Sequence, residues 1–233
     1  MNILAIDTAT ESCSAALSVG GEVISRYELA PRRHNHLILE MAQSLLSEAG
    51  LSLQQLDGVA FGRGPGSFTG VRIAASVVQG LAFGLDIPVL PVSTLQAMAH
   101  RAWRINKISY SLVAIDARMG EVYWSACHLE QQGQVELLTE EKVISPDAIH
   151  IPGDMIGYPW HALGTGWKSY GDRMLECLGI DLLSSEPEWF PHSHDIAVMA
   201  QYALIKGQGV PVENALPVYL RNQVAKKTVC RKR

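Results

Sequence analysis

The sequence has few charged residues, and this shortage already narrows the class of protein. Only 18% of its 233 residues are Asp, Glu, Lys or Arg, whereas an average soluble protein has roughly 25%. Because 48% of the residues are hydrophobic, the composition excludes intrinsic disorder. We therefore expect one large or two small folded domains, with some apolar surface covered by a partner.

Cysteines are also few, and no apolar run is long. The four cysteines, at positions 13, 127, 177 and 230, form no Cys-x-x-Cys pair. This spacing favours free thiols in a reducing cytosol over a disulfide framework or a zinc site. The longest uncharged apolar segment, residues 73–85, has thirteen residues, whereas a membrane-spanning helix needs about twenty. With no signal-peptide pattern at the start, we expect a soluble cytoplasmic protein.

Positive charge is scarce everywhere except at the carboxyl end. Residues 221–233 carry six cations and no acid, which leaves 13 cations against 23 anions in residues 1–220. An acidic body excludes a protein that coats nucleic acid over its whole surface. The basic tail either contacts phosphate groups or is a solvated terminus, and the second interpretation is favoured.

Short apolar strands and amphipathic helices alternate in the first half of the chain. The order βββαβαβα is too antiparallel at its start for a plain Rossmann domain. The predicted strands are 2–7, 14–19, 22–27, 59–62 and 87–92, and the predicted helices are 36–49, about 67–84 and about 93–103.

The second half repeats the beginning of the first. Leu4-Ala5-Ile6-Asp7 is echoed 109 residues later by residues 113–116, Val-Ala-Ile-Asp. Strands expected at 121–128 and 134–138, around a turn at residues 132–133, complete a second βββ unit. This favours duplication of one domain over chance similarity. Asp7 and Asp116 end the echoed strands, where each could hold Mg²⁺, act as a general base, or cap a turn.

Two domains are therefore expected. The first comprises residues 1–103 and is completed by a helix at 194–207. The second comprises residues 104–193 together with 208–233, which include the basic tail.

Residues 62–70, Gly-Arg-Gly-Pro-Gly-Ser-Phe-Thr-Gly, join a strand to a helix. Free N–H groups at a helix N-terminus suit an anion, so one interpretation is an anion cradle. The other is a tight turn in which glycines let two backbones approach and Ser67 or Thr69 caps the helix. Because the stretch contains a proline and no lysine, we favour the tight turn.

The helix that follows this turn has Arg72 as its only charge. A surface helix normally shows a polar face, so this one is either internal or presents an apolar strip to another protein. We favour the second interpretation and expect the helix at 36–49 to share the interface. The residues expected to contact the partner are Ile38, Met41, Leu45, Phe68, Val71, Arg72, Ala75, Val78, Gln79 and Ala82.

Four of the eight histidines form two closely spaced pairs, His34 with His36 and His192 with His194. Neither pair has the spacing of a known metal motif, and no Cys/His cluster accompanies them. Solvated or helix-capping histidines are the favoured interpretation.

Five segments together resemble the TsaB (YeaZ) family, and the resemblance spans the whole chain. They are residues 6–10, 62–72, 116–123, 164–167 and 217–221, of which the second and third are specific to the family. Ala74 stands where many relatives have glycine. The resemblance implies the ASKHA fold of actin, hexokinases and Hsp70, an α/β fold of two duplicated domains with a cleft between them.

The resemblance also implies that the catalytic parts are missing. The related protein TsaD holds a metal through two histidines four residues apart, and Thr94 and Met98 occupy that spacing here. Active ASKHA enzymes follow their phosphate-binding aspartate with glycines, whereas Asp116 is followed by Ala-Arg-Met. Only residues 164–166 stand near the place of an adenosine-binding Gly-Gly loop. ATP and a metal are therefore expected only in an assembled complex.

The function implied is that of a non-catalytic scaffold in threonylcarbamoyl-adenosine modification of tRNA position 37. It would form a heterodimer with TsaD, assemble with the ATPase TsaE, pair with itself when alone, and reach tRNA through the complex, aided by the basic tail. The alternatives are an autonomous ATP-dependent enzyme using Asp7 and Asp116 around Mg²⁺, or a metallopeptidase. The missing glycines and the missing ligand cluster disfavour both.

Overall fold

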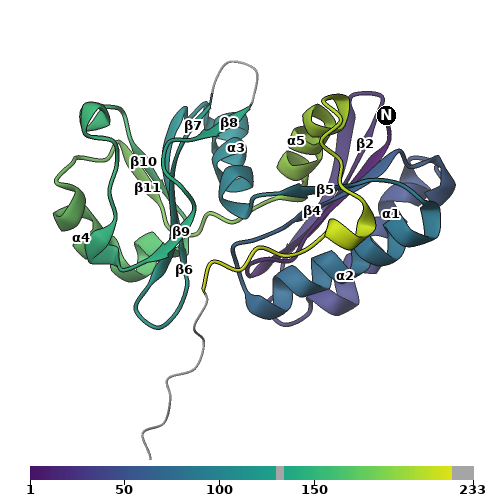
Figure 1. Cartoon of the computed structure of the whole chain (residues 1–233), viewed down its shortest axis with the longest axis horizontal. Helices are drawn as coiled ribbons and strands as arrows, with labels where there is room; N and C mark the ends of the chain where they lie inside the picture. Colours follow the sequence, from purple (N-terminus) through teal and green to yellow (C-terminus); the bar gives the residue numbers. More distant parts are fainter. Residues whose placement is uncertain (130–133, 222–233) are drawn as a thin grey trace, which may run out of the picture.

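Two mixed β-sheets, one in each half of the chain, form the two lobes seen side by side in Figure 1. This computed structural model describes residues 1–129 and 134–221. The first sheet has the order β3-β2-β1-β4-β5. Its strands are β1 (Ile3–Asp7), β2 (Ser12–Val19), β3 (Glu22–Leu29), β4 (Gly58–Gly62) and β5 (Val89–Val92).

The second sheet has the order β11-β10-β6-β7-β8, and a further strand, β9, pairs with β7. Its strands are β6 (Tyr110–Asp116), β7 (Val122–Leu129), β8 (Val135–Leu137), β9 (Lys142–Ile144), β10 (His161–Leu163) and β11 (Ser184–Glu186). Short 3₁₀ turns interrupt the loops at Leu53–Gln55, Pro146–Ala148, Gly153–Met155 and Val212–Asn214.

Each of the five strands of the first sheet has a counterpart in the second sheet, which adds β9. The central strand β1 is antiparallel to β2 and parallel to β4, and β6 is antiparallel to β7 and parallel to β10. The echoed residues Leu4–Asp7 and Val113–Asp116 lie in these two central strands. The predicted duplicated α/β fold of the ASKHA type is confirmed.

Helices cover both faces of each sheet. In the first lobe, α1 (His34–Glu48) and α2 (Phe68–Leu85) lie together on one face and α5 (Ser193–Ile205) lies on the other (Figure 1). Alternate residues of a strand point to opposite faces. Accordingly, in the second lobe Val113 and Ile115 pack with α3 (Thr94–Asn106), whereas Leu112 and Ala114 pack with α4 (Thr165–Leu178).

The position of helix α3 differs from the one that the predicted domain division gives it. A boundary after residue 103 would leave α3 with the first sheet, but α3 buries Leu95, Met98 and Ala102 in the core of the second lobe. Helix α5, in contrast, packs on the first sheet through Ile196 and Ala200. Helix α3 packs with the second lobe because its apolar face contacts β6 and β7, which follow it directly in the chain.

Helices α3 and α5 meet through a buried ionic cluster that connects the lobes. The carboxylate of Asp195 is fully buried and accepts two hydrogen bonds from Arg104, at 2.8 and 2.9 Å, and one from His100 at 2.7 Å. Burial acts to raise the pKa of Asp195, but these donors lower it below its usual range. The cluster stays ionic inside the protein because both carboxylate oxygens are hydrogen-bonded.

The structure describes some of the remaining expectations, on the cysteines and on the apolar helix, and not others. Cys13 and Cys127 are buried free thiols and Cys177 is an exposed one. Cys230, the turn at 132–133 and the basic tail after Arg221 lie outside the described residues. Among the residues described, α2 alone is long and apolar enough to cross a membrane by length and composition, and here it packs against the first sheet.

Candidate partner interface

The outer sides of α1 and α2 form an open groove of about 460 Å³ on the first lobe. Leu39 and Phe68 are large apolar side chains on this groove, 55% and 56% exposed. Arg72 is the only charged residue in the lining, and its guanidinium carbon lies 3.4 Å from the centre of the Phe68 ring. The lining residues are Asn35, Ile38, Leu39, Phe68, Thr69, Arg72, Ile73, Ser76 and Val77.

Six of the ten residues predicted to contact a partner are core residues of this chain instead. They pack against the first sheet, and none is more than 3% exposed. The apolar stripe marked the inner face of each helix, because burial against the sheet requires the same pattern as burial against a partner. The six are Ile38, Leu45, Val71, Ala75, Val78 and Ala82.

The other four predicted residues lie nearer the surface. Phe68 and Arg72 are exposed on the groove, and Met41 is half-buried. Gln79 is also half-buried, and its Nε2 donates to the Ala215 carbonyl at 2.9 Å. Sequence reasoning missed Leu39, Ile73 and Val77, because the sequence does not show which side of each helix faces the sheet.

The glycine-rich turn before α2 is a site of close backbone approach. A Cβ on Gly66 would lie 2.3 Å from the Ala9 carbonyl oxygen, and one on Gly70 would lie 2.0 Å from that of Thr8. The Ser67 N–H already donates to Ala9 O at 2.7 Å, and the Ser67 hydroxyl accepts from the Gly70 N–H at 3.4 Å. Two of the N–H groups of a possible anion cradle are therefore occupied within the chain, and the close backbone approach with Ser67 as the cap agrees with the tight-turn interpretation.

Asp7 ends β1 directly under this turn and is completely buried. Its Oδ1 accepts from the Ala9 N–H at 3.2 Å, while Oδ2 has no hydrogen-bond partner among the described residues. Desolvation raises the pKa of Asp7 to about 7, against the opposing effect of the Ala9 hydrogen bond. A carboxyl group sealed in this way caps a turn and has no exposed surface for Mg²⁺ or for a substrate.

We expect Asp7→Asn to stabilise the protein increasingly as the pH rises from 4 to 8. The pKa of Asp7 is raised from 3.8 to about 7 by folding, so its contribution to stability is greatest below pH 4 and is lost as the pH passes 7. At about 1.4 kcal/mol per pKa unit, the loss amounts to about 4 kcal/mol. Asparagine keeps an acceptor for Ala9 and carries no charge.

Urea unfolding at pH 4, 5, 6, 7 and 8 measures this effect. The free-energy difference between Asp7→Asn and the parent protein should grow across the series. The difference for Glu176→Gln, which alters an exposed carboxylate, should stay small throughout. A difference for Asp7→Asn that is independent of pH would contradict the assignment.

Asp116 also acts as a turn cap, at the start of the β6–β7 hairpin. Its Oδ1 accepts from the Arg118 N–H at 2.8 Å, and its Oδ2 accepts from Ser169 Oγ at 3.4 Å. Arg118 and Met119 both have left-handed backbones, with φ of 62° and 58°. The Arg118 side chain is 79% exposed, and that of Met119 is also exposed. The hairpin therefore carries two large side chains where a phosphate-binding hairpin needs glycine.

The paired histidines have different surroundings. His192 is the N-cap of α5: its Nδ1 accepts from the His194 N–H at 3.0 Å, and burial lowers its pKa to about 4. Burial also lowers the pKa of His194. His34 is buried with Nε2 3.2 Å from Ser12 O, whereas His36 is exposed. In the described ranges, His, Cys, Asp and Glu form no group of three that could hold a metal.

The two positions that correspond in spacing to the metal-binding histidines of TsaD are buried in this chain. Thr94 and Met98, in the first turns of α3, are 0% and 1% exposed. Met98 packs in the core of the second lobe, and its methyl group lies within 2.7 Å of where a Cβ of Gly164 would stand.

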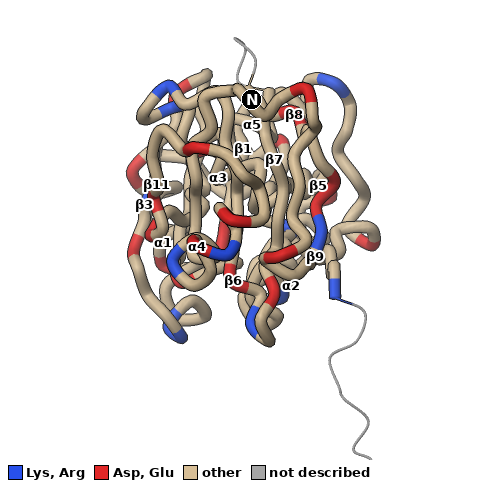
Figure 2. The backbone as a smooth tube through the Cα atoms, turned by 90° about the vertical axis from the view of Figure 1, so that its left-hand side faces the viewer, with Lys and Arg blue, Asp and Glu red and all other residues tan. Residues whose placement is uncertain are grey.

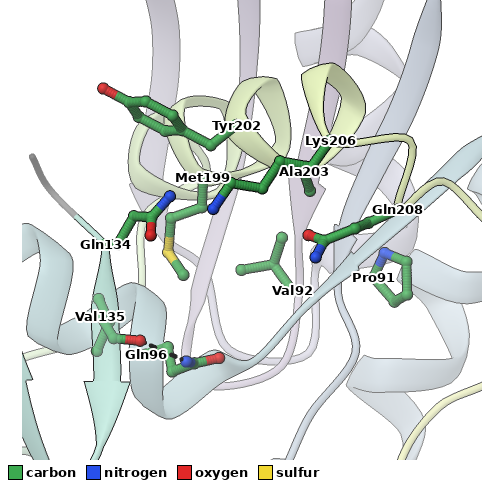
Figure 3. A pocket seen from close by; sticks show the side chains of 10 residues that line it. All are labelled: Pro91, Val92, Gln96, Gln134, Val135, Met199, Tyr202, Ala203, Lys206 and Gln208. Carbon is green, nitrogen blue, oxygen red and sulfur yellow. Dashed lines mark hydrogen bonds between the residues drawn. The ribbon is translucent and has the colours of Figure 1, made fainter.

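A second pocket, of about 250 Å³, lies between the lobes. In Figure 3, Lys206 and Gln208 from the first lobe face Gln134 and Val135 from the second, above an apolar floor that includes Val92. None of the residues predicted from the sequence lines it. They were missed because the pocket is assembled from segments far apart in the chain.

Charge is distributed unevenly over the molecule. In Figure 2 the charged residues of the second lobe, which faces the viewer, lie mainly on its loops and on α4. The α1–α2 groove has one cation and no acid in its lining. This groove is also larger than the pocket between the lobes, about 460 Å³ against about 250 Å³. Of these two concave surfaces it is the stronger candidate for contact with another protein.

Comparison with known proteins gives consistent matches along most of the chain. A family model described as "TsaD: tRNA N6-adenosine threonylcarbamoyltransferase" matches residues 21–206. The chain is 45% identical to "tRNA threonylcarbamoyladenosine biosynthesis protein TsaB" of Escherichia coli over 97% of both chains. It is 36% identical to the Bacillus subtilis protein of the same name, over 95% of this chain and 94% of that protein.

Solved structures agree with this result. The structure titled "YeaZ from Pseudomonas aeruginosa" is 45% identical and superposes with a TM-score of 0.88, covering 94% of this chain and 99% of that one.

Proposed function

The chain belongs to the TsaB family of tRNA threonylcarbamoyladenosine biosynthesis proteins, and we propose that it serves this modification as a non-catalytic subunit that binds TsaD through the α1–α2 groove. In this proposal the chain supplies a surface, and TsaD carries out the transfer of threonylcarbamate to adenosine 37. TsaE and tRNA join through the assembled complex, in the cytoplasm.

The observation that carries the proposal is the apolar groove on α1 and α2. Leu39 and Phe68 are more than half exposed, and Ile73 and Val77 line the same surface. Isolated apolar side chains on a surface are ordinary, whereas a contiguous apolar concavity marks a binding site. Covering this groove would remove apolar surface from water without burying any acid.

The choice of TsaD as the occupant follows from its relation to this chain. The TsaD family model matches residues 21–206, a range that includes α1 and α2. A related chain carries a related helix pair, and two such faces can meet about a twofold or nearly twofold axis. The same geometry lets the groove pair with a second copy of this chain when TsaD is absent. We propose that these two assemblies exclude each other.

The surroundings of the two aspartates support a non-catalytic role. An enzyme that uses Mg²⁺ and ATP needs carboxylates that reach the metal, and Asp7 is fully buried with its pKa raised to about 7. Asp116 accepts hydrogen bonds from its own turn, one of them from the Arg118 guanidinium, whose Nη1 donates to Oδ2 at 3.3 Å. Both carboxyl groups are engaged in local structure.

We expect the isolated protein neither to bind ATP at micromolar concentration nor to hydrolyse it. The N–H groups of Ser67 and Gly70 donate hydrogen bonds within the chain. The hairpin after Asp116 has no glycine before Gly120, so side chains fill the space that a phosphate group would need. Isothermal titration calorimetry with Mg-ATP and a phosphate-release assay measure the two properties. Micromolar binding, or turnover that Asp7→Ala abolishes, would contradict the proposal.

Reconstitution tests the proposed function directly. TsaD, TsaE and tRNA are combined with the remaining substrates, with and without this chain, and modified adenosine is quantified by mass spectrometry. We expect modification to depend on this chain and TsaD to co-elute with it in gel filtration. Full modification without the chain, or an absence of complex with TsaD, would refute the scaffold role.

A further inference from the structure

The segment after the last 3₁₀ turn, residues 215–221, runs in extended form from the first lobe to the second (Figure 1). The motif Pro-Val-Tyr-Leu-Arg at 217–221 belongs to it. The segment is neither a helix nor part of a sheet, yet its first residue, Ala215, is completely buried. Such burial without regular structure means that side chains and carbonyls elsewhere in the protein hold it in place. We call this segment the strap.

The strap is fixed to the first lobe at three points. Gln79 of α2 donates to the Ala215 carbonyl at 2.9 Å. The Val218 N–H donates to the Arg63 carbonyl, in the glycine-rich turn, at 2.8 Å. Arg72 Nε donates to the Tyr219 hydroxyl, also at 2.8 Å. These contacts leave the two following residues to reach the second lobe.

Arg221 makes the contact with the second lobe. Its Nη2 lies 2.6 Å from Glu121 Oε2 and donates at 3.2 Å to the carbonyls of both Ala117 and Arg118. The Arg221 side chain is 14% exposed, whereas its partner Glu121 is 40% exposed, so the buried part of the contact is the guanidinium. With the Met119 sulfur, which lies 2.7 Å from Nη1, one guanidinium group contacts four acceptors of the β6–β7 hairpin.

The contact with Arg221 stabilises an unfavourable backbone conformation in the hairpin. Arg118 and Met119 have φ of 62° and 58°, a left-handed conformation that is unfavourable for residues with a side chain. A donor that binds the carbonyls on this turn favours the observed conformation over the alternatives. Nη2 contacts the three oxygens and Nη1 contacts the Met119 sulfur, so the two ends of the planar guanidinium hold different residues of the turn, which a single lysine nitrogen does not do.

We propose that the strap is a latch between the lobes, and that Arg221 is the residue that closes it by holding the β6–β7 hairpin of the second lobe to the α2 side of the first. The lobes also meet at α3 and α5 through the Asp195 cluster and through Arg63 and Glu141, 2.7 Å apart. Releasing Arg221 would free the hairpin edge, while the α3–α5 contact and the Arg63–Glu141 ion pair would still connect the lobes and become the contacts about which they turn. This inference does not depend on the identity of any partner.

Distance measurements between spin labels test the latch in the full-length protein. Cys177 on α4 is exposed and accepts one label, and Ser47→Cys on the exposed side of α1 accepts the other, in a Cys230→Ser background. Arg221→Ala should broaden the distribution of distances between the lobes and shift its mean by several ångström. Hydrogen exchange of the backbone amides at 117–121 should accelerate at least tenfold in the same variant.

Two further variants make the result decisive. Glu121→Gln leaves the strap intact and removes the charged acceptor, so it should reproduce part of the effect, and it serves if Arg221→Ala does not fold. Arg173→Ala also removes an arginine paired with a carboxylate, but its partner Asp147 is in the same lobe, so the distances should not change. Unchanged distances and exchange in Arg221→Ala and Glu121→Gln, or equal broadening in Arg173→Ala, would overturn the proposal.

Discussion

Replacing Leu39 with glutamate should weaken capture of TsaD by about 100-fold or more while leaving the folded chain intact. Leu39 is 55% exposed on the groove, so in the free chain the new carboxylate stays in water. In the complex it would be buried without a partner charge, which costs about 3 to 5 kcal/mol and corresponds to that loss of affinity. Biolayer interferometry with immobilised TsaD measures the change.

The control variant is Leu183→Glu, which places the same charge on a leucine that is 67% exposed in the second lobe. It should bind TsaD like the parent protein. Leu45 and Val78, which the sequence pattern would have selected for the same test, are 0% and 1% exposed, so glutamate there would unfold the lobe instead. Sedimentation of the Leu39→Glu variant should also show reduced self-association. Loss of self-association with full TsaD capture would mean that the two assemblies use separate surfaces.

Replacing Gly70 with alanine should destabilise the protein by about 4 kcal/mol or more, the range reached only when the backbone or the core must be displaced. The added Cβ would stand 2.0 Å from the Thr8 carbonyl oxygen, a backbone atom that cannot rotate away. The Thr8 hydroxyl also donates to the Gly70 carbonyl at 2.7 Å, and a shift of either segment breaks this bond. The midpoint of thermal unfolding should fall by about 8 to 16 °C.

Gly80 provides a matched control within the same helix. Nothing lies within 4 Å of the position that its Cβ would occupy. Gly80→Ala should therefore stabilise α2 by roughly 0.5 to 1 kcal/mol, because alanine loses less backbone freedom than glycine on folding. Urea unfolding of both variants separates steric conflict from helix propensity. Equal stability of Gly70→Ala and Gly80→Ala would contradict the close-approach account of the turn.

The sequence was most informative where local chemistry decides the structure. The strand at Ile3–Asp7 and its echo at Tyr110–Asp116, the Ser67 cap of α2 and the Ser93 cap of α3 all follow from short-range patterns, and the structure has each of them. Gln96 has the spacing from Ser93 for a reciprocal capping box, but its side-chain amide donates instead to the Val135 carbonyl at 2.9 Å.

Features that depend on long-range packing were harder to predict. Helix α4 was missed because Gly166 and Gly171 weaken its pattern and Tyr170 has non-helical dihedral angles inside it. The inner and outer sides of α2 could not be distinguished, because Val77 and Val78 are equally apolar and only the position of the sheet decides which is buried. The strap has no periodicity, and its contacts join residues about a hundred positions apart.

The uncovered apolar groove also has a consequence for how much of this protein a cell can usefully make. Copies synthesised in excess of their partner keep Leu39 and Phe68 exposed to water, and such surfaces bind one another with an extent that rises with concentration. Self-pairing would protect the surplus as a reserve that newly made partner chains draw down by mass action. Under the proposed function, the surface of α1 and α2 would then require balanced synthesis of the two proteins.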